Sequence, residues 1–389
     1  MYAKKGRDTT VIDAMSSPGE SATGNATLDD DVVWTILQRP PSSAVLRSRA
    51  VCKTWHRITT DPSFLAAHAE RQPAELLAES GEGPALETIP LDSTRQRRHL
   101  HHPSHCVVRS MLGSCDGLLL FEESPYGICT CNFYVCNPVT RQGMWLDLLP
   151  PSCYGNLVRM CGFYRHGPSG EHRILVLANE GQHTGPAGAA HYVFSVTTAA
   201  SEPPRRLGPV ADGVVLQMYT SVLIENAHHR GKIHWAMHPV AKSAEKILAF
   251  DTVSEAFRLI SRPPWPSDRH YEAMEISLLE LDGMLAATAN EPSSDSMELW
   301  VLEDYGNDRS WSRRFRIDMP PNFDDRWATD TGVPGVLLVG SYNSSFVMLY
   351  HVREKRILRR IEFGKGTMGT SGHFLFKDSL VPYDFLDQY

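Results

Sequence analysis

Residues 28–58 constrain the fold more than any other stretch, because their apolar side chains recur at helical spacing. Asp29 or Asp30 can cap a first helix, since a carboxylate there accepts free backbone N–H bonds and suits the positive end of the helix dipole. One apolar stripe follows the cap and consists of Val32, Val33, Ile36 and Leu37. Pro40 and Pro41 then end the helix, because proline lacks the N–H donor and restricts the residue before it.

Three more short helices are expected before residue 73. Ser42 or Ser43 can cap the second, which carries Val45 and Leu46. The third places Val51, Trp55 and Ile58 at i, i+4 and i+7, so these side chains share one face. Asp61 followed by Pro62 matches a cap with proline at the first helical position, which begins the fourth helix.

This helical stretch is too small to be stable on its own. A bundle of about 45 residues usually needs disulfides, a metal or a partner. Cys52 is its one cysteine, so neither a disulfide nor a cysteine-rich metal site can brace it. Its apolar residues also exceed what one inward face requires. The surplus predicts a helix-rich partner; the alternative is a helical subdomain that docks on the rest of the chain.

Length and composition limit what else the chain can be. Its 389 residues can hold a small module plus one large domain or two medium ones. A net charge of −7 argues against nucleic acid as the main partner. No apolar run approaches the roughly 20 residues that a membrane span needs. Residues 1–27 are polar and lack the apolar core of a signal peptide, so we expect a disordered tail and an intracellular protein, in the nucleus, the cytoplasm or both.

From residue 73 onward, short apolar runs alternate with clusters of Gly, Pro, Asp and Asn, which predicts many short antiparallel strands. The runs repeat one order: a Gly-containing turn, an apolar strand, a strand that ends near Asp or Asn, and a strand with Arg and aromatic residues. Gly117, Gly231, Gly283 and Gly340 mark comparable positions. The widest gap between them leaves room for one more unit around residues 173–207.

A repeat of about 50 residues with several strands predicts propeller blades of the kelch kind. We expect five or six blades over residues 73–389. Strands near residues 76–91 would close the ring by pairing with strands near residues 373–383. A two-sheet sandwich is the structural alternative.

Motifs for catalysis or cofactor binding are scarce. The sequence contains no G-x-S-x-G, H-E-x-x-H or Walker A pattern. Residues 364–369 match G-x-G-x-x-G after a strand, but no helix follows whose N-terminus could hold a phosphate, so we expect a loop between blades. We therefore predict a protein without enzymatic activity and without a cofactor.

Cysteines and histidines raise the question of a metal. Seven of the eight cysteines lie between Cys106 and Cys161, just after four histidines, His99, His101, His102 and His105. No C-x-x-C pair occurs, and no second pair has the spacing of a zinc finger. Free thiols on strands are therefore expected and no metal, with zinc as the open alternative.

One dense basic run occurs near the C-terminus. It contains Arg353, Lys355, Arg356, Arg359 and Arg360. On a strand these residues would flank a buried face, and the alternative is a patch that binds an acidic target.

The helical stretch resembles the F-box. The matching residues are Leu28, Asp30, Asp31, Val32, Val33, Ile36, Leu37, Arg39, Pro41, Leu46, Arg47, Arg49, Val51, Cys52, Lys53, Trp55, Arg57 and Ile58. The most specific part is the run R-A-V-C-K-T-W, and D-P-S-F-L-A-A-H-A continues it as in plant members. Asp29, Thr35 and Pro40 depart from the family pattern.

Residues 115–121, 134–142 and 247–260 are similar to the F-box-associated β-propeller domain, which follows many plant F-boxes. The two resemblances imply an α+β multidomain chain, with a helical module at residues 28–72 and an all-β propeller of five or six blades at residues 73–389. They further imply a substrate-recognition subunit of an SCF-type (Skp–cullin–F-box) E3 ubiquitin ligase, with an unknown target on the propeller. The alternative is a propeller scaffold outside any ligase. The implied contacts with the Skp-type adaptor are Leu28, Val32, Val33, Ile36, Leu37, Pro41, Leu46, Val51, Cys52 and Trp55.

Overall fold

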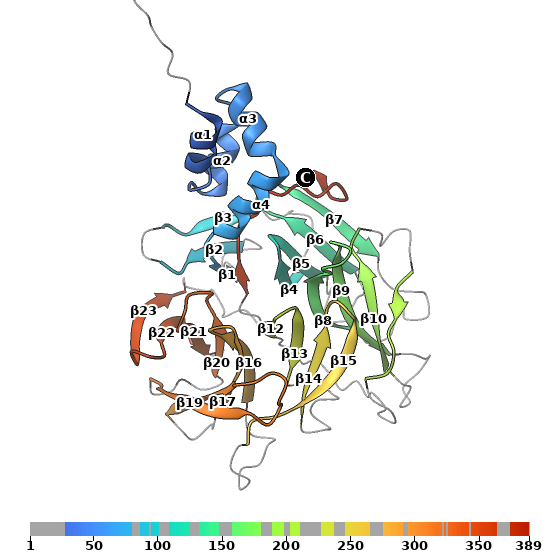
Figure 1. The fold of residues 1–389 in the computed structure, drawn as a ribbon, viewed down its shortest axis with the longest axis vertical. Helices are drawn as coiled ribbons and strands as arrows, with labels where there is room; N and C mark the ends of the chain where they lie inside the picture. The colour runs from blue at the N-terminus through green and yellow to red at the C-terminus, as the bar shows by residue number, and fades with distance from the viewer. Residues whose placement is uncertain are drawn as a thin grey trace, which may run out of the picture.

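The computed structural model describes residues 28–79, 86–92, 95–100, 109–123, 132–147, 158–179, 189–197, 203–210, 227–236, 246–264, 275–290, 295–320, 323, 326–341, 344–363 and 374–388. A small group of helices sits on a ring of β-sheets (Figure 1). The expected tail at residues 1–27 and the glycine-rich segment at residues 364–369 lie outside the described residues.

Four helices form the N-terminal part: α1 (Asp30–Leu37), α2 (Ser42–Ser48), α3 (Lys53–Thr60) and α4 (Pro62–Arg71). Asp61 caps α4 as predicted, because its Oδ1 accepts the backbone N–H of Ser63 at 2.9 Å. Asp29 is the N-cap residue of α1, one of the two predicted, but its side chain makes no capping hydrogen bond. The predicted cap of α2 is wrong, because Pro41 is its N-cap and Ser42 is buried inside its first turn. Each described helix, α4 included at 10 residues, is too short to cross a membrane.

Six antiparallel sheets surround a common axis as the blades of a propeller, which agrees with the predicted five or six and excludes the sandwich (Figure 1). From the inner strand outward, blade 1 contains β24 (Leu375–Phe376), β1 (Glu75–Glu79), β2 (Leu86–Pro90) and β3 (Arg98–Leu100). Blade 2 contains β4 (Arg109–Cys115), β5 (Leu118–Glu123), β6 (Asn132–Asn137), β7 (Gln142–Asp147) and β25 (Asp387–Gln388). Blade 3 contains β8 (Val158–Arg165), β9 (His172–Asn179), β10 (Ala189–Ser195) and β11 (Arg205–Arg206).

The remaining three blades follow the same order. Blade 4 contains β12 (Ala227–His229), β13 (Lys232–Trp235), β14 (Lys246–Asp251) and β15 (Ala256–Ser261). Blade 5 contains β16 (Glu275–Leu281), β17 (Met284–Asn290), β18 (Ser296–Leu302) and β19 (Trp311–Asp318). Blade 6 contains β20 (Arg326–Asp330), β21 (Val336–Ser341), β22 (Phe346–His351) and β23 (Arg356–Glu362). The unit expected around residues 173–207 is blade 3.

Two-residue turns join the first two strands of several blades. Gly117, Gly231 and Gly283 each follow a residue with positive φ and have positive φ themselves, as a type I′ hairpin requires. The prediction that these three glycines occupy equivalent positions is confirmed, but the prediction that Gly340 occupies the same position is wrong. Gly340 lies within β21, where a Cβ atom would come 2.1 Å from the Trp327 ring.

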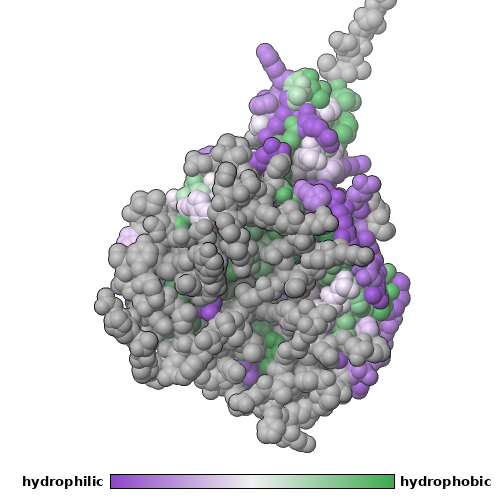
Figure 2. All heavy atoms as spheres, turned by 180° about the vertical axis from the view of Figure 1, so that it is seen from behind, coloured by the Kyte–Doolittle hydropathy of each residue, from purple (hydrophilic) through white to green (hydrophobic). Residues whose placement is uncertain are grey.

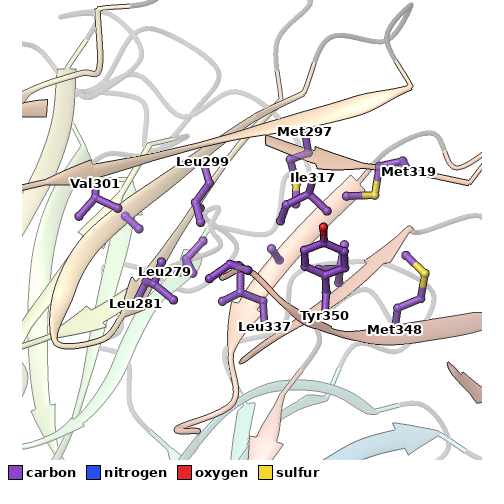
Figure 3. Close-up of a cluster of buried hydrophobic side chains, with 14 of the residues drawn as sticks. Leu279, Leu281, Met297, Leu299, Val301, Ile317, Met319, Leu337, Met348 and Tyr350 are labelled. Carbon is purple, nitrogen blue, oxygen red and sulfur yellow. The ribbon is translucent and has the colours of Figure 1, made fainter. Parts of the chain in front are cut away.

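Each described hydrophobic core of the propeller belongs to two neighbouring blades. On β9, Ile174 and Val176 face the core between blades 2 and 3, whereas Leu175 and Leu177 face the core between blades 3 and 4. Figure 3 shows the equivalent core between blades 5 and 6, to which every strand from β16 to β22 contributes. Because both faces of such strands are buried, they read as continuous apolar runs rather than as an alternating pattern.

The ring closes in blade 1, where the first strand of the propeller, β1, pairs with β24 from near the C-terminus. Strand β24 pairs with β1 through Leu375 opposite Leu76, which confirms the predicted closure. Arg98 reinforces this pairing, since its guanidinium donates to Asp378 Oδ2 at 3.0 Å and also to the Glu75 carboxylate. Both acidic side chains are almost completely buried, at 5% exposure for Glu75 and 4% for Asp378. The closure therefore depends on a buried charge network.

The helical module and the propeller share side chains. Leu380, which follows β24, is buried in the module's core together with Val33 and Phe64, and Val139 from the β6–β7 turn packs against the same cluster. Asn137 fixes this segment, because its Nδ2 donates to the carbonyl of Ser379 at 3.1 Å. The module is thus attached at two places far apart in the sequence, through α4 and through the segment around Leu380 (Figure 1).

His68 of α4 is fully buried in the module. Its Nε2 lies 3.0 Å from the carbonyl oxygen of Pro40, and the neutral ring donates there. Its Nδ1 is buried without a hydrogen-bond partner. Burial lowers the pKa of His68, although the bond to Pro40 and the charge of Asp378 oppose the effect.

Replacing Arg98 by Met should destabilise the propeller by about 2–3 kcal/mol, because the carboxylates of Glu75 and Asp378 lose their main partner while they stay buried. Arg95, 3.8 Å from Glu75, is too far away to replace the lost hydrogen bond. Urea unfolding measures the difference. The matched control is Arg316→Met, since Arg316 and Asp318 form an exposed pair whose loss should cost under about 1 kcal/mol. Equal losses in the two variants would show that the network does not stabilise the closure.

Lowering the pH should destabilise the fold through His68. The unfolded chain binds a proton near the ordinary histidine pKa of about 6.5, whereas the folded module resists it, so stability falls as the pH drops below that value. His68→Phe removes this contribution and should make the dependence between pH 6.5 and 5 less steep, while the buried His234, whose pKa burial lowers to about 3, still contributes. Thermal unfolding at several pH values measures the difference. Parallel curves for both proteins would contradict the assignment.

Candidate protein-binding surface

Helix α1 carries an exposed apolar stripe. Leu28, Val32 and Ile36 lie at i, i+4 and i+8, and their exposed fractions are 57%, 44% and 45%. This spacing places Val32 and Ile36 on one face of α1, and Leu28 lies just before the N-cap residue Asp29. Figure 2 shows hydrophobic spheres at the surface of the module, next to strongly hydrophilic ones. Three neighbouring aliphatic side chains in water favour a protein partner on this face.

The opposite face of α1 holds the module together. Val33 and Leu37 are 2% and 3% exposed and lie in one cluster with Val45 of α2. Trp34 meets Phe64 of α4 edge to face, with ring centroids 5.2 Å apart. These contacts fix α1 on the module, so the stripe of Leu28, Val32 and Ile36 is presented on a packed support.

A second exposed part lies at the start of α3. Val51 is 62% exposed, and Cys52 next to it is exposed as well. The Cys52 sulfur caps α3, since it accepts the backbone N–H of Trp55 at 3.5 Å. Trp55 itself is half-buried and packs against the module's core.

Charged side chains connect the helices beside these apolar groups. Arg57 of α3 pairs with Asp30 of α1, and both side chains are more than half exposed. Arg49 is half-buried, and its Nη2 donates to the carbonyl of Thr59 at 3.0 Å. Burial lowers the pKa of Arg49. The exposed pair contributes under about 1 kcal/mol to stability.

The structure divides the predicted contact residues by exposure. Six are exposed: Leu28, Val32, Ile36, Pro41, Val51 and Cys52. Leu46 and Trp55 are half-buried. Val33 and Leu37 belong to the module's own core. These two side chains therefore support the exposed surface from below and are not available for direct contact with a partner.

Sequence reasoning missed the residues that complete the module from the propeller side. Leu380 lies in the module's core, and Val139 and Val381 pack against it. The one available signal was the apolar pair Leu380 and Val381 directly after the polar residues 377–379. A local pattern cannot reveal which distant element such a pair contacts.

One group in the described part of the chain could hold a metal. Ligand atoms of Cys115, Asp116 and His172 lie within 4.8 Å of one another. Hydrogen bonds between blades explain the group: His172 Nε2 lies 3.3 Å from Asp116 Oδ2, and the Tyr383 hydroxyl donates to the Asp116 carbonyl at 2.9 Å. Burial, with help from Asp116, raises the pKa of the Cys115 thiol, which disfavours the thiolate that a metal binds.

The described cysteines are free thiols: Cys52, Cys115, Cys136 and Cys161. Cys106, Cys129, Cys131 and Cys153 lie outside the described residues, as do His101, His102 and His105.

Most of the basic run is engaged within the chain. Arg353 pairs with Asp282 at 2.5 Å, and Arg356 with Glu354 at 2.5 Å. Arg359 donates to backbone carbonyls at the end of β2, and Arg360 lies over the Phe346 ring. These partners favour a structural role over a patch for an acidic target.

Comparison with known proteins gives relatives along nearly the whole chain. The F-box protein At5g18160 of Arabidopsis thaliana is 22% identical, over 98% of this chain and 93% of that protein. The F-box protein At5g49610 of the same plant is 27% identical, over 74% of this chain and 78% of that protein. Among solved structures, the Nidogen/Laminin complex aligns with a TM-score of 0.42 at 12% identity, over 79% of this chain and 99% of that chain.

A family match covers most of the chain. Residues 88–383 match the F-box associated beta propeller domain. This span runs from within β2 through β24 and contains strands of all six sheets, whereas β1 and β25 lie outside it. The chain belongs to the family of the F-box associated beta propeller domain.

Proposed function

We propose that this chain is the substrate-recognition subunit of an SCF-type E3 ubiquitin ligase. The four helices would be an F-box that binds a Skp-type adaptor, and the propeller would bind the target protein. The observation that supports this most is the exposed stripe of Leu28, Val32 and Ile36 on a family member whose relatives are F-box proteins. Val51 and Cys52 would extend the adaptor contact, as would Pro41.

The proposed role requires no catalytic group in this chain. A receptor works by holding target lysines near the ubiquitin carrier, which raises their effective concentration to the order of millimolar. That effect needs a fixed distance between adaptor and target. Leu380 in the module's core and the Asn137 side chain on Ser379 supply such a fixed attachment.

Departures from the F-box pattern should weaken the adaptor contact rather than remove it. Pro40 replaces an apolar leucine, and the lost contact is worth about 1–2 kcal/mol if that side chain is normally buried. In this chain the Pro40 carbonyl has a structural task, since it accepts the hydrogen bond of His68. Thr35 is exposed, and its hydroxyl donates to the Asp31 carbonyl at 2.9 Å.

We propose an intracellular location, in the nucleus, the cytoplasm or both, because a Skp–cullin ligase works there. A scaffold outside any ligase is the second candidate, and the departures at Asp29 and Pro40 are what favour it. Adaptor binding decides between the two candidates.

Val32→Asp and Ile36→Asp should each weaken adaptor binding by about tenfold or more, because a buried carboxylate without a partner is costly at an apolar interface. Co-purification of the full chain with a plant Skp-type adaptor, followed by titration, measures the change. Both side chains are exposed, so these variants should fold normally, unlike variants of Val33 or Leu37.

Val253→Asp is the matched control, since Val253 is 55% exposed on the propeller, away from the module. It should leave adaptor binding unchanged. A wild-type chain that fails to bind any Skp-type adaptor would reject the ligase role and leave the scaffold.

A further inference from the structure

A pocket of about 370 Å³ lies where the module's last helix meets blades 1 and 6. Its lining comes from separate segments: residues 72–75 from the end of α4 to the start of β1, residues 90–92 at the end of β2, Arg95, residues 331–333 after β20, Val336 at the start of β21, Lys377, and single residues from β22 and β23. The lining is mainly apolar, and Val333 and Leu358 at its edge stay 53% and 38% exposed. The volume is in the range of sites that bind one large side chain or a small ligand.

Hydrogen bonds hold one wall of the pocket in place. The Thr331 hydroxyl donates to the Val336 carbonyl at 2.8 Å and accepts the backbone N–H of Val333 at 3.2 Å. The backbone N–H of Gly335 donates to Asp282 of blade 5 at 2.8 Å. Val333 is therefore presented by a turn that is fixed from both sides.

The opposite wall is fixed as well. Arg359 reaches from β23 to blade 1, where its Nη1 donates to the carbonyls of Pro90 at 3.0 Å and Leu91 at 3.1 Å. Leu358, the preceding residue, lines the pocket. Because the walls are ordered before anything binds, little conformational entropy is lost on binding.

Among the described residues that line the pocket, two are cations, Arg95 and Lys377, and they differ in their partners. The buried Glu75 carboxylate is held by Arg98 and lies 3.8 Å from Arg95, and Asp92 lies 4.0 Å from Arg95. Lys377 also lines the pocket and is exposed, yet it makes no hydrogen bond or ion pair with the part of the chain that the structure describes. A carboxylate on an incoming chain would complement this ammonium group.

Strand β23 offers a backbone edge beside the pocket. It is the outer strand of blade 6 and, among the described strands, pairs only with β22. The equivalent strand of blade 2, β7, accepts β25 along its outer edge, with Asp387 opposite Gly143. The outer edge of a blade in this protein can therefore take an added strand. An extended chain along β23 would direct alternate side chains to the side on which Leu358 lies.

We propose that this pocket recognises the target protein. It takes a large apolar side chain from an extended segment that carries Asp or Glu one or two residues away, and Lys377 binds that carboxylate. The claim that the bound protein is a target for ubiquitination rests on the proposed function. The claim that the pocket binds such a segment does not.

The test selects peptides from a phage-displayed random library on the full chain. Enriched peptides should carry a large apolar residue within two positions of Asp or Glu. Leu358→Ser should weaken a selected peptide about tenfold, because the anchor loses its apolar wall. Ile357→Ser should not, since Ile357 is the neighbouring exposed residue and does not line the pocket. Lys377→Glu should change the enriched flank to Lys or Arg, whereas Lys355→Glu, an exposed cation outside the pocket, should change nothing.

Peptides without this pattern, or peptides that bind the Leu358→Ser variant as tightly as the wild type, would overturn the proposal. So would a Leu358→Ser variant that loses the Skp-type adaptor and keeps its peptides, because the pocket would then extend the adaptor surface. Val32→Asp separates the two hypotheses. It should keep peptide binding while it loses the adaptor, so each activity can fail without the other.

Discussion

Apolar burial between blades is the constraint on which the rest of this structure depends. Each described core of the propeller is shared by two blades, so no sheet can bury both of its faces alone. The first blade must therefore meet the last, and the chain achieves this by placing β24 next to β1. Ring closure is a requirement for every core, and the buried network of Arg98, Glu75 and Asp378 lies at that junction.

The same closing segment also fixes the helical module. After β24 the chain passes Asp378, reaches Leu380 in the module's core and continues to β25 on blade 2. One short segment thus joins the two ends of the ring and the base of the helices. The exposed stripe on α1 and the pocket beside α4 are held on one framework, as the proposed receptor with two partners would require.

Much of the fold could be predicted because its physical causes are local. Runs such as residues 174–178 are apolar on both faces, which distinguishes blade strands from the half-polar strands of a sandwich. Gly117, Gly231 and Gly283 were recognisable because a type I′ turn requires positive φ. Gly340 was wrongly predicted to lie in such a turn. Its small size is needed for packing against Trp327 and not for a positive φ.

The binding surfaces could be predicted only in part. The sequence shows that Val32, Val33, Ile36 and Leu37 are apolar, but α1 is apolar over a wide arc, so the spacing cannot tell the buried pair from the exposed pair. That division depends on Leu380 and Phe64, which lie elsewhere in the chain. The pocket beside α4 could not be predicted from the sequence for the same reason, since its lining comes from segments that only the closed ring brings together.

The position of Leu380 also has a consequence for synthesis on the ribosome. The four helices emerge before the propeller strands, but the side chain that completes their core follows β24, after strands β1 to β23 have been made. A leucine missing from a core costs about 2–5 kcal/mol, a large loss for so small a bundle. An unfinished polypeptide therefore carries a loosened module, and in the proposed receptor it would recruit the ligase poorly until the propeller is whole.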